Sequence, residues 1–198
     1  DERVTLNLTA LADPRAFLRG SDQSYDLILA AMPEPASALD NRYYTREFFA
    51  LCTRRLSKQG VLGFRLGSSE NLWTPHLLRR AASIGRALRE TLGDAVVLPG
   101  SSNLFLASRQ RLSRDPDLLS RRFQQRRIAA RLVSPAYIRY LYENDRFEES
   151  RRRLEATRAA VNTDTRPICF QNTLIIWLSR FYPMLSLREL SFLYEPGR

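Results

Sequence analysis

The chain has 198 residues, of which 44% are hydrophobic and 26% are charged, so it suits one domain with a real core and a small appendage and excludes a fully disordered protein. One histidine and two distant cysteines, with no CxxC spacing, give no reason to expect a metal site. The net charge of +10 indicates an anionic surface nearby, either a nucleic acid or the cytoplasmic face of a membrane.

Near the start, residues 4–8 alternate between apolar and polar side chains, which predicts a strand. Asp13 then precedes Pro14. Aspartate is a good N-cap and proline is favoured at the first helical position, so a helix should begin here.

The stretch from residue 25 to residue 66 predicts a strand, a loop, a helix and a second strand. The apolar run at residues 27–30 reads as a buried strand of a parallel sheet. Prolines on both sides of Glu34 end it, because proline lacks the backbone N–H that a continuing element needs. The helix should end at Gly60, and residues 61–66 form the next strand. The apolar face of this helix would carry Tyr44, Phe48, Leu51, Cys52 and Leu56.

Thr74 and Pro75 predict the start of another helix, and Gly93 predicts its end. We expect His76, in the first turn, to face solvent rather than to act as a base. Residues 95–98 and 103–107 surround a Pro-Gly turn and predict an antiparallel hairpin at the edge of the sheet.

Residues 111–198 should form a basic helical extension, since they contain 17 basic and 10 acidic side chains, against 14 and 11 in residues 1–110. Five arginines between residues 121 and 131 recur at helical spacing. Another helix should start at Ser134-Pro135, and a capping box at Asp145 and Glu148 should start a third that runs to about Ala160.

The last apolar segment, residues 168–187, is interrupted by Arg180 and Pro183 and is too short to span a bilayer. We expect it to lie at a membrane interface, with Trp177, Phe181 and Tyr182 at headgroup depth.

Five motifs together carry a resemblance to a known family: Tyr25-Asp26-Leu27-Ile28, Pro33-Glu34-Pro35, residues 41–49 (NRYYTREFF), residues 56–62, and, more loosely, residues 162–167 (NTDTRP). In this order and spacing they resemble the polyamine aminopropyltransferases, the spermidine synthase family, and are closest to its membrane-fused bacterial members. The resemblance implies an α/β fold with a partial Rossmann-like, class I methyltransferase-type sheet. Residues 1–110 would be the C-terminal part of this domain, and the Gly-rich first strand would lie upstream of Asp1.

The family resemblance also implies chemistry: aminopropyl transfer from decarboxylated S-adenosylmethionine to an amine, without a metal. Asp13 matches the acidic residue that accepts a hydrogen bond from the adenine amino group; a simple N-cap is the alternative, and both roles can hold at once. The usual catalytic aspartate falls on Ala31, which can neither accept a proton nor pair with an ammonium. Glu34 is the remaining carboxylate of that loop and the candidate base.

Three functions stay open at this point. The first is a spermidine-synthase-like transferase, degenerate at Ala31, that takes a polyamine-type substrate in the cytoplasm or at the inner face of a membrane. The second is a non-catalytic regulatory or scaffolding domain of a membrane protein. The third and weakest is an RNA-binding module, because the arginine-rich helices lack the aromatic and glycine signature of an RRM. The sequence gives no expectation for the oligomeric state.

Overall fold

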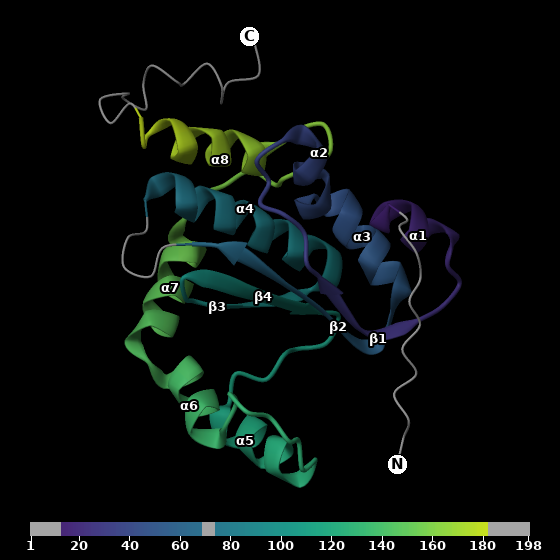
Figure 1. The fold of residues 1–198 in the computed structure, drawn as a ribbon, viewed down its shortest axis with the longest axis vertical. Helices are drawn as coiled ribbons and strands as arrows, with labels where there is room; N and C mark the ends of the chain where they lie inside the picture. The colour runs from purple at the N-terminus through teal and green to yellow at the C-terminus, as the bar shows by residue number, and fades with distance from the viewer. Residues whose placement is uncertain (1–12, 69–73, 182–198) are drawn as a thin grey trace.

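The computed structural model describes residues 13–68 and 74–181, which form one four-stranded mixed sheet with helices packed around it (Figure 1). The strands are β1 (Tyr25–Ala30), β2 (Leu56–Gly67), β3 (Asp94–Leu98) and β4 (Ser102–Ser108), in the spatial order β1-β2-β4-β3. The helices are α1 (Pro14–Gly20), α2 (Ala38–Asn41), the short η1 (Arg42–Tyr44), α3 (Arg46–Arg55), α4 (Pro75–Leu92), α5 (Pro116–Gln125), α6 (Pro135–Glu143), α7 (Asp145–Ala156) and α8 (Ile168–Leu178).

The sheet has the predicted α/β, partial Rossmann-like topology. β1 and β2 run parallel, joined by the crossover that contains α3, and β4 and β3 add an antiparallel hairpin beside β2. The predicted strands at 26–30 and 61–66 and the hairpin at 95–98 and 103–107 are therefore confirmed. The predicted strand at residues 4–8 lies outside the described residues.

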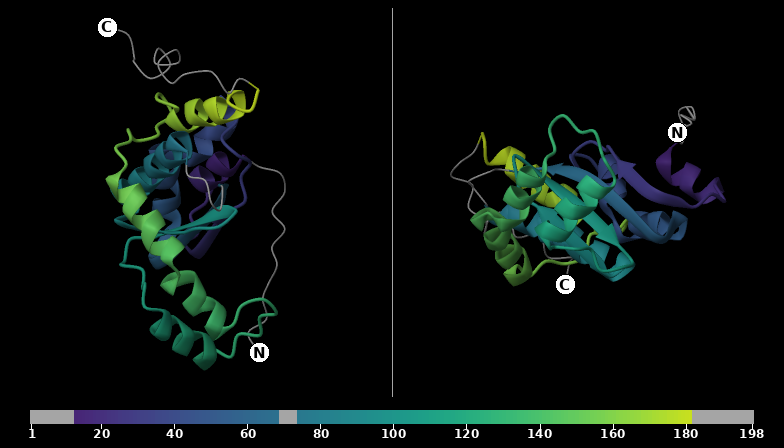
Figure 2. Two further views of the ribbon diagram at one scale, coloured as in Figure 1. Left: turned by 90° about the vertical axis from the view of Figure 1, so that its left-hand side faces the viewer. Right: turned by 90° about the horizontal axis from the view of Figure 1, so that it is seen from below.

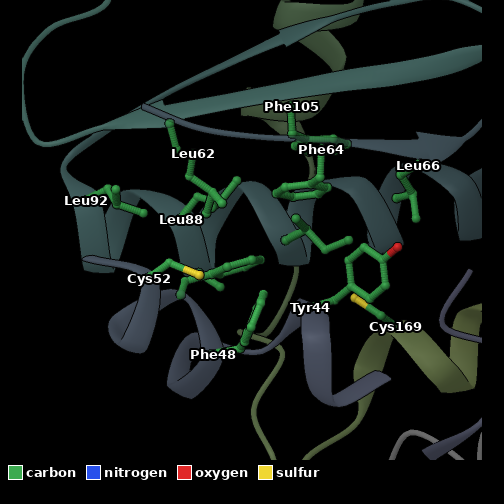
Figure 3. Packing of buried hydrophobic residues seen from close by; sticks show 14 of the residues in the cluster. Tyr44, Phe48, Cys52, Leu62, Phe64, Leu66, Leu88, Leu92, Phe105 and Cys169 are labelled. Atoms are coloured by element: carbon green, nitrogen blue, oxygen red, sulfur yellow. The ribbon is translucent and has the colours of Figure 1, made fainter. Parts of the chain in front are cut away.

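The main core lies between the sheet and the layer formed by α3 and α4 (Figure 3). Phe64 on β2 is its centre: its ring stacks on Phe105 of β4 at 5.1 Å and on Phe49 of α3 at 5.7 Å. Ile84 and Leu88 of α4 are fully buried against the same layer. Aromatic pairs of this kind add stabilisation beyond the area that they bury.

Phe64→Ala should lower the free energy of unfolding by about 3–5 kcal/mol, because it opens a cavity among stacked rings. Leu29→Ala on the neighbouring strand is the matched control: its side chain is 70% exposed and its loss should change stability by less than about 0.5 kcal/mol. Urea unfolding followed by circular dichroism measures both. Equal effects of the two substitutions would contradict this account of the core.

β1 is less buried than its apolar sequence predicts. It lies at the edge of the described sheet, and Leu27 and Leu29 are 55% and 70% exposed. The opposite edge is better covered, since Phe147 of α7 packs on Val96 and Leu98 of β3. The expectation of a buried strand was wrong on this face because no described helix covers it beside β1.

The prediction that α3 ends at Gly60 was also wrong. α3 ends at Arg55, and Leu56 already has the extended backbone of β2. Gly60 lies inside β2, where a Cβ atom would approach the Tyr25 carbonyl oxygen to 2.8 Å. The glycine therefore serves the close approach of two parallel strands rather than a helix end. Gly93, in contrast, ends α4 with φ 97° as predicted.

The C-terminal extension is helical as expected, but its helices have different ends. α5 ends at Gln125, and Arg127 has a left-handed φ of 48°, so Arg131 lies beyond the helix. α7 is capped by Asn144, whose side chain accepts a hydrogen bond from the Phe147 N–H at 3.1 Å, rather than by Asp145, and it stops at Ala156. The division of the chain at residue 110 stays a prediction.

α8 packs on α4 with Ile168, Cys169 and Ile175 buried, while Trp177 is 53% exposed. In the part of the chain that the structure describes, no helix has the length and apolarity to cross a bilayer. Cys52 and Cys169 are both buried free thiols, and burial raises the pKa of each to about 12.

Candidate functional site

The candidate site lies where the parallel strands β1 and β2 end. The carboxyl ends of parallel strands are the usual ligand-binding edge of an open α/β sheet. Residues 31–35 follow β1 and Gly67 ends β2, so these two segments form the edge. Asp13, at the start of α1, is connected to the same region through its contacts with residues 42 and 43 of η1.

The loop after β1 is held from the core by Tyr44. The Tyr44 hydroxyl donates to the carbonyl oxygens of Pro33 at 2.8 Å and Met32 at 3.2 Å. Burial, and then the negative charge of Glu34, raise the pKa of Tyr44, so the phenol stays a donor. The ring itself is only 2% exposed. Tyr44 therefore belongs to the core, as its place on the predicted apolar face indicates.

Glu34 is engaged through both carboxylate oxygens. One oxygen lies 2.7 Å from Nη1 of Arg80, and the other accepts a hydrogen bond from the Gly67 N–H. A Cβ atom at residue 67 would collide with the Glu34 carboxylate, so this contact requires glycine. Glu34 therefore closes the edge by joining the β1 loop to the end of β2. Its role as a base stays a prediction.

Arg80 is a buried cation of α4, only 4% exposed. Besides Glu34, it donates to the Gly67 carbonyl oxygen at 2.6 Å and to the Thr173 hydroxyl of α8 at 3.1 Å. A buried guanidinium is stable only when it is paired and hydrogen-bonded, and these three partners engage both of its terminal nitrogens, while its Nε is buried without a hydrogen-bond partner. No local pattern identifies Arg80, since nothing near it in the sequence distinguishes it from the exposed arginines around it.

Asp13 caps α1, as the helix-start interpretation predicted. Its side chain accepts a hydrogen bond from the Arg15 N–H at 2.9 Å and forms an ion pair with Arg42 at 2.5 Å. Tyr43 donates to it at 3.4 Å. The backbone hydrogen bond from Arg15 and then the contact with Arg42 keep the pKa of Asp13 below its ordinary value, although burial opposes them. The adenine-binding role of Asp13 stays a prediction.

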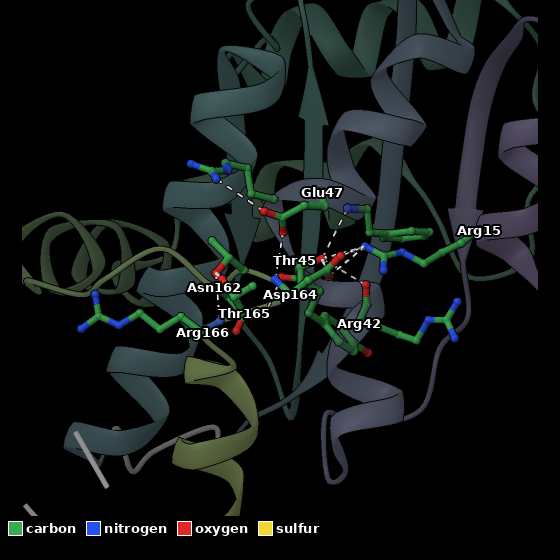
Figure 4. A network of polar contacts seen from close by, with 12 residues as sticks. Arg15, Arg42, Thr45, Glu47, Asn162, Asp164, Thr165 and Arg166 are labelled. Atoms are coloured by element: carbon green, nitrogen blue, oxygen red, sulfur yellow. Dashed lines mark hydrogen bonds and ion pairs between the residues drawn. The ribbon is translucent and has the colours of Figure 1, made fainter. Parts of the chain in front are cut away.

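A second polar network ties the turn at residues 162–167 to the start of α3 (Figure 4). Asp164 forms an ion pair with Arg15 at 2.9 Å and accepts a hydrogen bond from Thr45 at 2.8 Å. Its N–H donates to Glu47 at 3.0 Å. Asn162 is fully buried and donates to the Tyr44 carbonyl oxygen at 2.9 Å. The Asn-Thr-Asp turn is therefore a tie between distant segments, and no candidate site residue belongs to it.

Burial alone would raise the pKa of Asp164, but the hydrogen bonds from Arg15 and Thr45 hold it below its ordinary value of 3.8. A carboxyl whose pKa is lower in the folded state stabilises the fold above its unfolded-state pKa, and this contribution is lost as the pH falls through the folded-state pKa. We therefore expect Asp164→Asn to be less stable than the wild type at neutral pH. The difference should shrink as the pH falls below 3.8.

The measurement is urea unfolding across this pH range. Asp22→Asn is the control. Asp22 is fully exposed, and its ion pair with Arg55 is long, at 3.7 Å. A stability difference between Asp164→Asn and wild type that is independent of pH would show that the charge of Asp164 does not act in this way.

His76 does not face solvent, contrary to the expectation. It is 8% exposed, and its Nδ1 lies 3.1 Å from Oδ1 of Asn172 on α8. Burial lowers the pKa of this imidazole. The reason is that α8 lies across the first turn of α4, which no local pattern around residue 76 reveals.

Ala31, on which the family resemblance would place a catalytic aspartate, is exposed directly after β1. It supplies no polar side chain to the edge. Among residues 13–68 and 74–181, no three His, Cys, Asp or Glu side chains gather closely enough to hold a metal ion.

Comparison with known proteins shows no family for this chain. No family model and no curated protein sequence matches the chain. Solved structures with a similar fold include a probable spermidine synthase from Corynebacterium glutamicum, with 17% identity and a TM-score of 0.45 over 77% of this chain and 53% of that chain. They also include human methyltransferase-like protein 13 in complex with SAH, with 15% identity and a TM-score of 0.43 over 75% of this chain and 60% of that chain. This chain therefore spans little more than half the length of either.

Proposed function

We propose that the chain is part of a spermidine-synthase-like transferase domain in which aminopropyl transfer has been lost or strongly weakened. The Rossmann-like sheet and the family resemblance of its motifs support the first half of this statement. Decarboxylated S-adenosylmethionine would be the co-substrate and a polyamine-type amine the acceptor. The ion pairs that the carboxylates of Glu34 and Asp13 form with arginines support the loss or weakening of aminopropyl transfer.

The observation that carries the proposal is the engagement of Glu34. Aminopropyl transfer needs a group that takes a proton from the acceptor amine, and it joins two substrates that are cations at neutral pH. Ala31 offers no carboxylate, and both oxygens of Glu34 are occupied by Arg80 and Gly67. Asp13 is paired with Arg42. Arginines therefore already neutralise the carboxylates that would attract an ammonium.

We expect little or no transfer of an aminopropyl group to putrescine by the wild-type protein, because a positioned base typically contributes about 10²–10⁴-fold. Ala31→Asp should raise the rate if the acceptor pocket is otherwise present. Glu34→Gln is the paired variant; because it removes the counter-ion of the buried Arg80, its fold is checked by circular dichroism before its turnover is compared with that of the wild type. Turnover measured by product chromatography decides the matter: robust wild-type activity that survives Glu34→Gln would place the base elsewhere and overturn the proposal.

Nucleotide binding is tested separately, at Asp13. Asn is as good an N-cap as Asp, so Asp13→Asn should preserve α1 while its amide replaces the oxygen that adenine would use. Binding of methylthioadenosine should weaken by about 1–2 kcal/mol for one lost hydrogen bond to a charged group. Isothermal calorimetry measures this loss, and Ser37→Ala, at the cap of α2, is a control for a general cap defect. Unchanged affinity for Asp13→Asn would remove Asp13 from the site.

The second candidate function is a non-catalytic regulatory or scaffolding domain. The same observation favours it, because the Glu34–Arg80 pair serves to join four segments of the fold. An inactive Ala31→Asp variant that also fails to bind methylthioadenosine would favour this candidate over a weakened enzyme.

A further inference from the structure

The helices α5 and α6 project from the molecule at the end opposite to α8 (Figures 1 and 2). They pack on each other, and their facing side chains line a shallow apolar groove that contains Leu119, Phe123, Ile138 and Leu141. The segment that connects the two helices lies at their free end. We call residues 121–140 the α5–α6 tip.

The tip gathers exposed apolar side chains on a short piece of chain. Leu132 is 88% exposed, Tyr140 57% and Ile128 49%, and Tyr137 and Val133 are exposed as well. Single exposed apolar residues are ordinary on a protein surface, but here five lie close together in the sequence, and the rings of Tyr137 and Tyr140 stack on each other at 6.3 Å. The tip therefore has a surface that water solvates poorly and that the described fold leaves uncovered.

The tip is also basic throughout. Residues 121–140 contain six arginines and no acidic side chain. Arg139 pairs with Asp117 at 2.5 Å, while the other five arginines make no ion pair with any described residue. By contrast, the arginines of α7 are largely neutralised by Glu148, Glu149 and Glu155 on the same helix. The unpaired positive charge of the extension is thus concentrated beside its exposed leucine and tyrosines.

We propose that the α5–α6 tip docks on the surface of an anionic lipid bilayer. Arginines suit the lipid phosphates, aliphatic side chains such as Leu132 and Ile128 suit the acyl boundary, and tyrosines suit the headgroup region between them. An RNA partner would use the arginines and tyrosines but would leave the aliphatic side chains in water. An apolar protein surface would leave five arginines unpaired.

The other exposed aromatic pair, Trp177 and Phe181 at the end of α8, is a weaker lipid site. The rings lie 4.9 Å apart, but Arg180 is the one basic residue near them in sequence among the described residues. Because α8 and the tip occupy opposite ends of the molecule, a flat bilayer cannot contact both at once (Figure 1). Trp177 therefore provides a matched control for a substitution in the tip.

The test is co-sedimentation of the full chain with vesicles of phosphatidylcholine alone or mixed with phosphatidylglycerol. Binding should require the anionic lipid and should weaken as salt is raised, since salt screens surface charges. Leu132→Ser should weaken partitioning about tenfold by removing one inserted side chain. Arg127→Gln should weaken it about fivefold, by the loss of one charge near the surface.

Trp177→Ala and Arg152→Gln, the second an exposed arginine of α7, should bind as the wild type does. Leu132 is so exposed that Leu132→Ser should unfold at the wild-type temperature, which separates docking from stability. Equal binding to neutral and anionic vesicles, or a loss caused by Trp177→Ala and not by Leu132→Ser, would overturn the proposal. So would tighter binding to a single-stranded RNA that depends on Arg127 and is indifferent to Leu132→Ser.

Discussion

The buried guanidinium of Arg80 is the constraint on which the arrangement of α4, α8 and the ends of β1 and β2 depends. It lies in the second turn of α4 and contacts the loop after β1 through Glu34, the end of β2 through the Gly67 carbonyl, and α8 through Thr173. Removing one partner of a buried ion pair leaves an uncompensated charge and is far more costly than the net value of the pair. Glu34, Gly67 and Thr173 are therefore interdependent although they lie on three separate segments. The return of α8 onto α4 is part of the same arrangement, because Cys169 and Ile175 are buried there.

This constraint changes what the edge of the sheet can do. In an open α/β sheet the loop after a parallel strand is free to present a side chain to a ligand, because the strand end fixes its position and nothing else needs it. Here the carboxylate of that loop is a structural partner of a buried cation, and the loop backbone is also held by Tyr44. A side chain cannot act well both as the counter-ion of Arg80 and as a proton acceptor. Residue 31 is alanine and Glu34 is bound to Arg80, so residues 31–35 present no carboxylate that is free of an arginine.

Local patterns predicted the parts of the fold that local physics decides. The strand at 26–30, the hairpin and α4 follow from apolar periodicity, from the Pro-Gly turn and from caps such as Gly93, and all were confirmed. Contacts between distant segments were missed, because nothing near a residue reports them. Arg15 and Asp164 meet across 149 positions, and His76 is covered by a helix almost a hundred residues later. Gly60 is the instructive case: a helix end and a close approach of two strands both call for glycine, and only the tertiary structure distinguishes them.

The two ends of the molecule are held in a defined relation. The bidentate contact of Arg114 with Asp94 fixes the segment that leads from β4 to α5, and Phe147 and Leu154 bury α7 along β3 and α4. The α5–α6 tip is thereby attached to the sheet through packed elements at both of its ends. The carboxyl ends of β1 and β2 lie on the other side of the sheet, next to α8, as the contact between Arg80 and Thr173 shows. A molecule docked on lipid by its tip would therefore direct the Glu34 edge away from the bilayer and into water, the phase that carries nucleotides and polyamines.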